Sequence, residues 1–248
     1  RSVVRSRSSY PPSYGISYCA SGSLDKACAV ANKRRMEKSK FTKHDVEVLD
    51  KTNSHDGYFD LNIFTLRHRL FKGGWSAPLT REIFERGHAV AVLPYDPARD
   101  EVLLIEQFRP GAHIAMVDDP WFEGDASPWL LEAVAGIIED GERPEDVAYR
   151  EALEETGTQI TDLISISHYL ATPGGSTESV FCFIGRVDTG DVKGLHGVDH
   201  EGEDIRPFTV SLDDAYGGIE SGRVNNAMTI IALQYLMLNR AAVRERWS

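Results

Sequence analysis

The chain has 248 residues, 42% hydrophobic and 26% charged, as is usual for a globular protein with one sizeable core. Residues 1–40 hold nine Lys/Arg and two acids, which leaves 18 basic and 36 acidic residues, a net charge of −18, in the rest. Such an acidic body excludes nucleic acid as a partner, because that binding depends on phosphate neutralisation. No apolar run reaches the roughly 20 residues of a membrane-spanning helix, so we expect no membrane partner.

The N-terminal stretch differs in composition from the remainder. Residues 1–43 begin with an Arg-, Ser- and Pro-rich run, and we predict a disordered leader. The three cysteines are sparse and have no metal-ligand spacing, which favours a reducing, cytoplasmic compartment without a disulfide framework. Cys182 lies in an apolar run and is interpreted as a core residue.

Alternating apolar and polar residues begin at His44 and predict β-strands. The first three stretches are HDVEVLD, YFDLNIFTLRHRLF and LTREIFE, which form an N-terminal β segment over residues 44–85. HAVAVLPYD and EVLLIEQFRP follow, joined through residues 97–100 in a predicted hairpin. Residues 111–128 contain two prolines and are predicted to be a loop.

Residues 136–158 read GIIEDGERPEDVAYREALEETGT and are predicted to hold a helix from Pro144 to Gly157. Arg143 precedes it and is a poor N-cap. Charged residues and glycines occupy the spacing G-x5-E-x7-R-E-x-x-E-E-x-G: Gly136, Glu142, Arg150, Glu151, Glu154, Glu155 and Gly157.

Glu154 and Glu155 lie three and four residues after Glu151, so the three glutamates crowd one helix face and repel one another. A hard divalent cation would remove that repulsion. The alternative is a solvated acidic face, which the complete pattern disfavours. Arg150 is predicted to pair with Glu142 and to hold the preceding loop against the helix.

Beyond this helix we predict the strands ISISHYLAT and ESVFCFIGRVD, separated by Pro173-Gly174-Gly175. A polar loop covers residues 196–205, and RPFTVSL is a further strand. A short helix in LDDAYGGIESG is followed by a long helix that begins after Asn226 and ends near Arg244. Strands flanked by helices predict an α/β/α sandwich with a mixed sheet over residues 86–248.

The spacing in residues 136–157 resembles the Nudix box, the signature of hydrolases that cleave nucleoside diphosphates linked to another group. Pro173, sixteen residues after Gly157, and the segment GLHGVDHEGEDI extend the resemblance to the ADP-ribose pyrophosphatase branch of bacteria. It covers about Phe64 to the C-terminus. The resemblance implies hydrolysis of ADP-ribose to AMP and ribose 5-phosphate, with two or three Mg²⁺ or Mn²⁺ ions, in a homodimer joined through residues 44–85.

Two other functions remain open at this stage. The same chemistry could act on another nucleotide sugar, such as GDP-mannose. A non-hydrolysing ADP-ribose sensor would need an effector domain and often lacks box acids, whereas here the box is complete and no effector domain is visible.

The resemblance also implies residue roles. The Ala135 carbonyl with Glu151, Glu154 and Glu155 would hold metal. Glu201 would be the general base and Glu203 a further metal-associated acid, or the reverse, and the alternative for both is a solvated loop. The implied catalytic set also includes Arg150, and Gly136, Glu142 and Gly157 are structural. The implied substrate-binding residues are Arg81, Arg109, Tyr58, Phe59, Pro173, Gly174 and Glu178, where Tyr58 and Phe59 could equally be packing residues.

Overall fold

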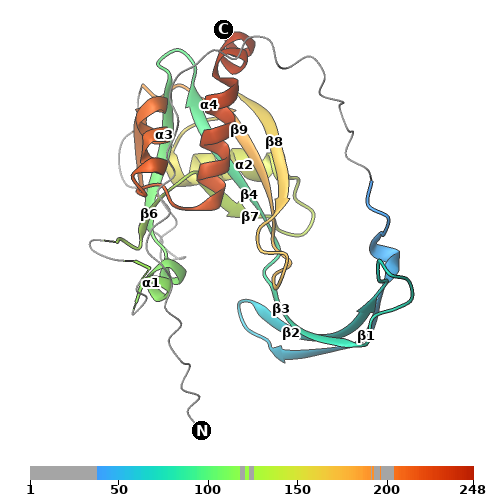
Figure 1. Ribbon diagram of the computed structural model, residues 1–248. Helices are drawn as coiled ribbons and strands as arrows, with labels where there is room; N and C mark the ends of the chain where they lie inside the picture. Colours follow the sequence, from blue (N-terminus) through green and yellow to red (C-terminus); the bar gives the residue numbers. More distant parts are fainter. Residues whose placement is uncertain (1–37, 118–120, 123–125, 191, 193–195, 197–203) are drawn as a thin grey trace. The chain divides into compact units, whose positions relative to one another are not determined.

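The computed structural model describes residues 38–117, 121–122, 126–190, 192, 196 and 204–248 (Figure 1). Residues Lys43–Ser248 form one compact unit, which holds all the elements described here. The predicted leader falls almost entirely outside the described residues. The strands are β1 Val46–His55, β2 Asp60–His68, β3 Leu79–Glu85, β4 His88–Asp96, β5 Glu101–Phe108, β6 Trp129–Glu132, β7 Val134–Ile137, β8 Asp162–Leu170, β9 Ser179–Arg186 and β10 Arg206–Ser211; the helices are α1 Pro110–Met116, α2 Pro144–Thr156, α3 Leu212–Glu220 and α4 Ala227–Trp247.

The first three strands form an antiparallel sheet of their own, in the order β1-β2-β3. A short 3-10 helix, Lys43–Asp45, precedes β1. Strand β2 lies in the centre and pairs on both sides, for example through Phe64 with Lys51 and with Arg81. The small N-terminal antiparallel segment expected from the alternating sequence is therefore confirmed.

The other seven strands form one mixed sheet, with β10-β5-β4-β9-β8 as its main path. Strand β6 pairs with β5 and β7 pairs with β4, both antiparallel. Strand β4 runs parallel to β9, while β5 runs antiparallel to β4 after a tight connection over residues 97–100. The predicted hairpin and the mixed sheet are both confirmed.

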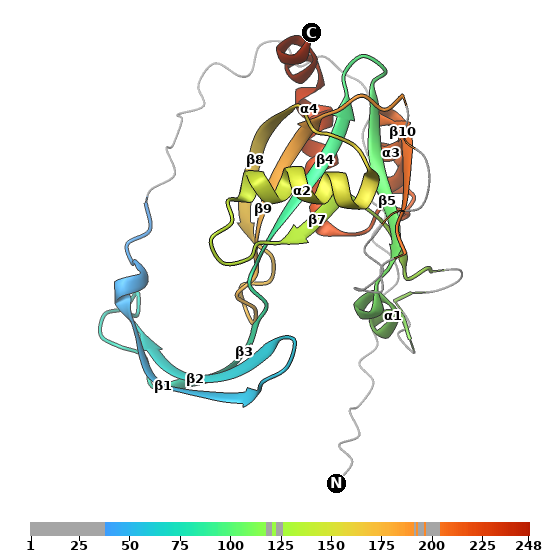
Figure 2. The ribbon, with the colours of Figure 1, turned by 180° about the vertical axis from the view of Figure 1, so that it is seen from behind.

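Helices cover both faces of this sheet (Figures 1 and 2). On one face, α3 and α4 pack through Leu212, Leu233 and Leu236 onto a fully buried cluster. On the other face, α2 packs through Val147 and Ala148 onto a second cluster. The α/β/α sandwich is confirmed, because apolar residues on alternate sides of the strands each need a cover.

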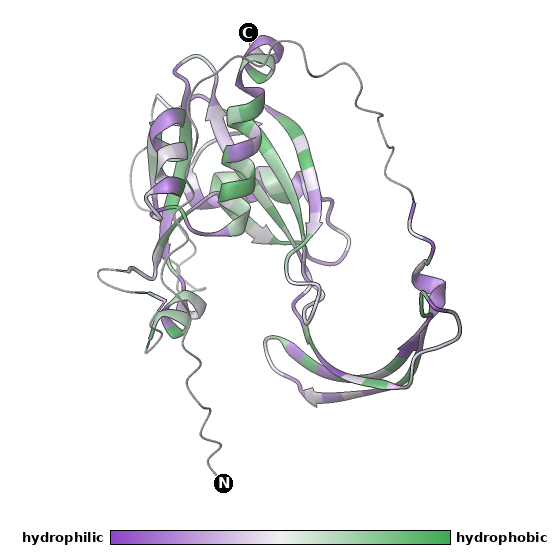
Figure 3. Cartoon of the chain, in the orientation of Figure 1, coloured by the Kyte–Doolittle hydropathy of each residue, from purple (hydrophilic) through white to green (hydrophobic). Residues whose placement is uncertain are grey.

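Two of the predicted core features agree with the structure. Cys182 is fully buried in the α3/α4 cluster, and burial raises the pKa of its thiol to about 12, as expected for a core residue. Helix α4 begins where Asn226 accepts a hydrogen bond from the Thr229 backbone N–H, and hydrophobic and hydrophilic residues alternate along it (Figure 3). It ends at Trp247, beyond the predicted end.

None of the helices in the described part is long and apolar enough to cross a membrane.

One prediction was wrong. The segment 111–128, predicted to be a loop, begins with helix α1. Pro110 occupies the first helical turn, where its missing N–H costs nothing. The following residues, Gly-Ala-His-Ile-Ala-Met, contain no residue that stops a helix of two turns.

Candidate active site at helix α2

Helix α2 has the ends that its sequence predicts. Pro144 lies in the first turn, and Arg143 precedes it without a side-chain capping bond. Gly157 ends the helix with φ 66°, in the left-handed region, and its N–H donates to the Leu153 carbonyl. The helix therefore presents its acidic residues at a fixed position against β7.

Arg150 connects the acidic residues of the helix and of the loop before it. Its Nε and Nη2 each donate to Glu142 at 3.3 Å, so the predicted pair is confirmed. Its Nη1 donates to Glu151 at 2.8 Å and to Glu154 at 3.1 Å. Burial alone lowers the pKa of Arg150, but the charges of Glu151 and Glu142 raise it above its ordinary value. One guanidinium thus offsets much of the repulsion that we assigned to a metal ion alone.

Glu151 and Glu155 turn toward the start of the box. A Cβ on Gly136 would fall 1.8 Å from Oε1 of Glu151, so only glycine leaves room for this carboxylate. Glu155 is 3% exposed, and the Ala135 backbone N–H donates to its Oε2 at 3.3 Å. Two carboxylates thus lie beside the backbone of Ala135 and Gly136.

This donor set fits a hard divalent cation, because Mg²⁺ prefers carboxylate and carbonyl oxygens. The absence of a Cβ at Gly136 lets the Glu151 carboxylate lie against the backbone here, close to Glu155, which suits a shared cation. Within the described residues, no group of three or more His, Cys, Asp or Glu side chains is gathered as a complete ligand cage. A site of two protein carboxylates that shares its cation with substrate phosphates needs no such cage.

Sequence reasoning missed the buried partner of Arg109. Glu132, on β6, is 4% exposed, and its Oε2 accepts a hydrogen bond from Nε of Arg109 at 2.7 Å. Antiparallel pairing of β6 with β5 places Glu132 opposite Ile105. An acid inside the apolar run WLLEAVAG was the available signal, since buried carboxylates are almost always paired.

Several predicted substrate residues meet near the start of β4. The Phe59 ring contacts the rings of Tyr58 and Phe84 edge-on, and the Arg86 guanidinium lies 5.4 Å from its centre. Arg86 also pairs with Glu178 at 3.2 Å.

The Pro173-Gly174-Gly175 turn joins the same region, because the Phe84 N–H donates to the Gly175 carbonyl at 2.8 Å. Tyr58 is 85% exposed, whereas Arg81 lies on β3 and donates to its neighbour Thr80. The structure therefore brings Phe59, Glu178 and the turn together and does not bring Arg81 to them.

Glu201 and Glu203 lie outside the described residues. His196 and Ile205, which flank them, exchange backbone hydrogen bonds of 2.9 and 3.0 Å. The His196 ring lies against Gly157, where a Cβ would come within 2.8 Å of its Cε1. His196, where the acidic segment 196–205 begins, therefore lies next to the C-terminal end of α2.

Comparison with known proteins agrees with this geometry. The model of the NUDIX domain matches residues 85–228. The chain belongs to the Nudix family. Its Nudix domain includes β4–β10 and α2, and thus the whole box.

Related proteins cover most of this Nudix chain. It is 45% identical over 208 residues to the ADP-ribose pyrophosphatase of Escherichia coli K12, covering 84% of this chain and 95% of that protein. It is 40% identical over 215 residues to the enzyme of that name from Haemophilus influenzae, covering 87% and 96%. A GDP-mannose pyrophosphatase of Yersinia pestis is 34% identical over 182 residues, covering 73% and 86%. A crystal structure of an ADP compounds hydrolase matches with a TM-score of 0.60 at 18% identity, covering 80% and 96%, and supports the fold alone.

Proposed function

We propose that this Nudix protein hydrolyses the diphosphate of ADP-ribose to AMP and ribose 5-phosphate. The observation that carries the proposal is the complete box, whose Glu151 and Glu155 lie beside Ala135 and Gly136. The relatives named ADP-ribose pyrophosphatase are more similar to this chain than the one named GDP-mannose pyrophosphatase, which supports the choice of substrate.

Glu151, Glu155 and the Ala135 carbonyl would hold Mg²⁺, with Glu154 and Glu203 as further acids of the site. Bound divalent cations would neutralise charge on the phosphate oxygens and lower the pKa of a coordinated water. Arg150 keeps the Glu142 loop and the helix carboxylates in place through its four hydrogen bonds. The two or three ions per site and the acceptance of Mn²⁺ belong to the proposal.

The remaining residues divide the work between proton transfer and substrate binding. Glu201, or Glu203 in its place, takes the proton of the attacking water as the general base. Arg109, held by Glu132, binds the diphosphate. Arg81, Tyr58, Phe59 and Glu178, with the turn at Pro173 and Gly174, bind the two ends of the substrate.

The test is mass spectrometry of the products formed from ADP-ribose and Mg²⁺ in ordinary and in ¹⁸O-labelled water. We expect AMP and ribose 5-phosphate, with one ¹⁸O in one of the two phosphates, which identifies the phosphorus that water attacks. Preference for GDP-mannose at equal concentration would contradict the substrate and leave the chemistry intact. Binding of ADP-ribose without any product would instead support a sensor.

We also propose that the chain is a cytoplasmic homodimer joined through residues 44–85. The exposed Val48 and Leu49 of β1 support a partner for this sheet. Light scattering on the intact chain would measure the mass, and a monomer at micromolar concentration would contradict the dimer.

A further inference from the structure

Gln107 carries a polar group that the fold does not satisfy. It stands on β5 and is 5% exposed, and its amide nitrogen is buried with no hydrogen-bond partner in the described part of the chain. Ile105 and Leu103, two and four residues earlier, belong to the cluster on the α2 face. Alternation along the strand therefore directs Gln107 to that face as well. Buried amide N–H groups are nearly always paired, so this donor requires an explanation.

Arg109 follows on the same face. Its backbone is extended, with φ −119° and ψ 108°, so the alternation continues from Gln107 to Arg109. Glu132, opposite Ile105, accepts from Nε of Arg109. Glu132 holds this guanidinium through Nε, and the Arg109 side chain is 36% exposed, so its two terminal amino groups can reach a ligand.

The acidic segment 196–205 leads into strand β10 opposite Gln107. Strand β10 begins at Arg206, opposite Glu106, so Ile205 leaves the sheet beside Gln107. Ile205 is fully buried in the cluster on the α2 face. Gln107 thus pairs with Leu130 of β6 and lies near Arg109, two residues further on, and near Ile205, which ends the segment that carries Glu201 and Glu203.

We propose that Gln107 and Arg109 form one anion subsite, in which the Gln107 amide donates to a non-bridging oxygen of the substrate diphosphate. Glu132 is a positioning residue that fixes the Arg109 fork. The inference rests on the proposed function. The Gln107 amide and the Arg109 guanidinium both donate hydrogen bonds, and an anionic oxygen is the ligand atom that accepts from both. The guanidinium by itself would orient only part of the diphosphate. Because the amide nitrogen is buried in the structure, substrate binding has to expose it.

The first test is Gln107→Met, which keeps the length of the side chain and removes the donor. We expect the KM for ADP-ribose to rise about tenfold or more with kcat within twofold, since a bond to a phosphate oxygen made in both ground and transition state affects binding alone. The melting temperature should stay equal or rise, because no unsatisfied donor is left. Gln234→Met, on the exposed side of α4, is the matched control and should change neither.

A second variant and a binding measurement complete the experiment. Gln107→Glu places a negative charge at the subsite and should raise the KM further than Gln107→Met. Calorimetric titration with the α,β-methylene analogue of ADP-ribose should show the same loss of affinity without turnover. In addition, Glu132→Gln should add nothing to Arg109→Ala in the double variant, because the carboxylate acts through the guanidinium.

If Gln107→Met kept its KM and its affinity for the analogue within twofold of wild type, the inference would be overturned. The Gln107 amide would then be a partner of a buried water. Additive losses in the Glu132/Arg109 pair would overturn the positioning role. Failure of the proposed function would look different, because the wild-type chain itself would then not hydrolyse ADP-ribose.

Discussion

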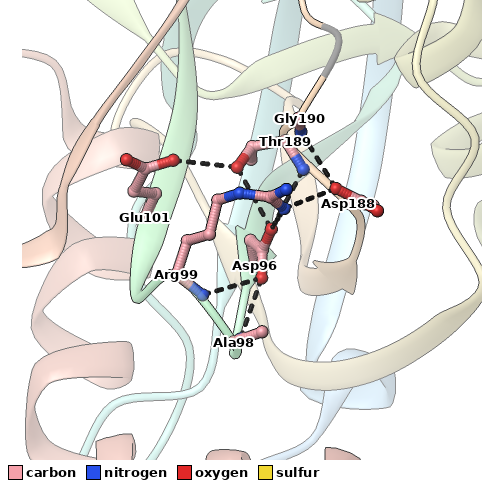
Figure 4. A network of polar contacts seen from close by, with 7 residues as sticks. All are labelled: Asp96, Ala98, Arg99, Glu101, Asp188, Thr189 and Gly190. Carbon is pink, nitrogen blue, oxygen red and sulfur yellow. Dashed lines mark hydrogen bonds and ion pairs between the residues drawn. The ribbon is translucent and has the colours of Figure 1, made fainter.

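Replacement of Asp96 by Asn should destabilise the protein by disrupting the junction between the β4–β5 hairpin and the end of β9 (Figure 4). Asp96 is 2% exposed. Its Oδ1 accepts from the backbone N–H groups of Ala98 and Arg99, at 2.8 and 3.1 Å. Its Oδ2 accepts from the N–H and hydroxyl of Thr189, both at 3.1 Å, and from the Arg99 guanidinium at 2.7 Å. An Asn amide nitrogen at Oδ2 would face the Thr189 N–H and the Arg99 guanidinium, while the Thr189 hydroxyl has a second acceptor in Oε2 of Glu101 at 2.8 Å.

The magnitude follows from the carboxylate's pKa. Burial alone raises the pKa of Asp96, but the N–H groups of Thr189 and Arg99 and the Arg99 side chain lower it from 3.8 to about 2. A downward shift of nearly two units corresponds to about 2.5 kcal/mol in favour of the folded, ionised form. Adding the mispaired amide, we expect Asp96→Asn to cost about 3 kcal/mol, or roughly 6–12 °C in melting temperature.

The pH dependence provides the sharper test. Because the folded pKa is depressed, the stabilisation is complete above the unfolded pKa near 4 and is lost as pH falls from about 4 to about 2. The difference in unfolding free energy between wild type and Asp96→Asn, measured by urea denaturation, should shrink across this window. Asp188→Asn, at an 81% exposed carboxylate paired with the same arginine, is the control and should cost well under 1 kcal/mol. A difference that stays constant from pH 5 to 2.5 would refute the electrostatic reasoning.

Three further predictions concern the active site. Gly136→Ala should fold but lose most of its turnover, because the new Cβ would displace the Glu151 carboxylate, and steady-state kinetics beside a melting curve would check this. Glu155→Gln should lower turnover far more than stability, and near-normal kcat at saturating Mg²⁺ would argue against the metal site. Glu201→Gln should slow hydrolysis by roughly 10²- to 10⁴-fold with little change in the calorimetric affinity for the methylene analogue. The same profile in Glu203→Gln instead would exchange the two roles.

The sequence predicted those parts of the site that depend on spacing along one element. Helix α2, its left-handed end at Gly157 and the Arg150–Glu142 pair all follow from residues within one turn or two of each other. The short apolar runs of β4, β5 and β9, bounded by turn residues, likewise predicted the strands of the sandwich. In each case the physical signal is local, so a linear pattern contains it.

The parts that the sequence did not predict depend on pairing between distant strands. Glu132 reaches Arg109 only because β6 adds to β5, and Asp96 reaches Thr189 only because β4 lies beside β9. Helix α1 was missed for a different reason. A seven-residue helix has too few turns to show a period, and the two prolines of its segment favoured a loop.

The arrangement around Arg150 separates metal binding from folding. The four box carboxylates, Glu142, Glu151, Glu154 and Glu155, lie in or beside α2. A helix that depended on bound cations to offset their repulsion would lose stability whenever the metal left. Arg150 donates to three of them, Glu142, Glu151 and Glu154, and so supplies an internal counter-charge. The helix can therefore form before metal binds, with Glu151 already against Gly136 and Glu155 already at the Ala135 N–H. A site that is preformed in this way spends little of its cation-binding free energy on ordering the chain, so loss of a metal carboxylate should reduce activity without a matching loss of stability.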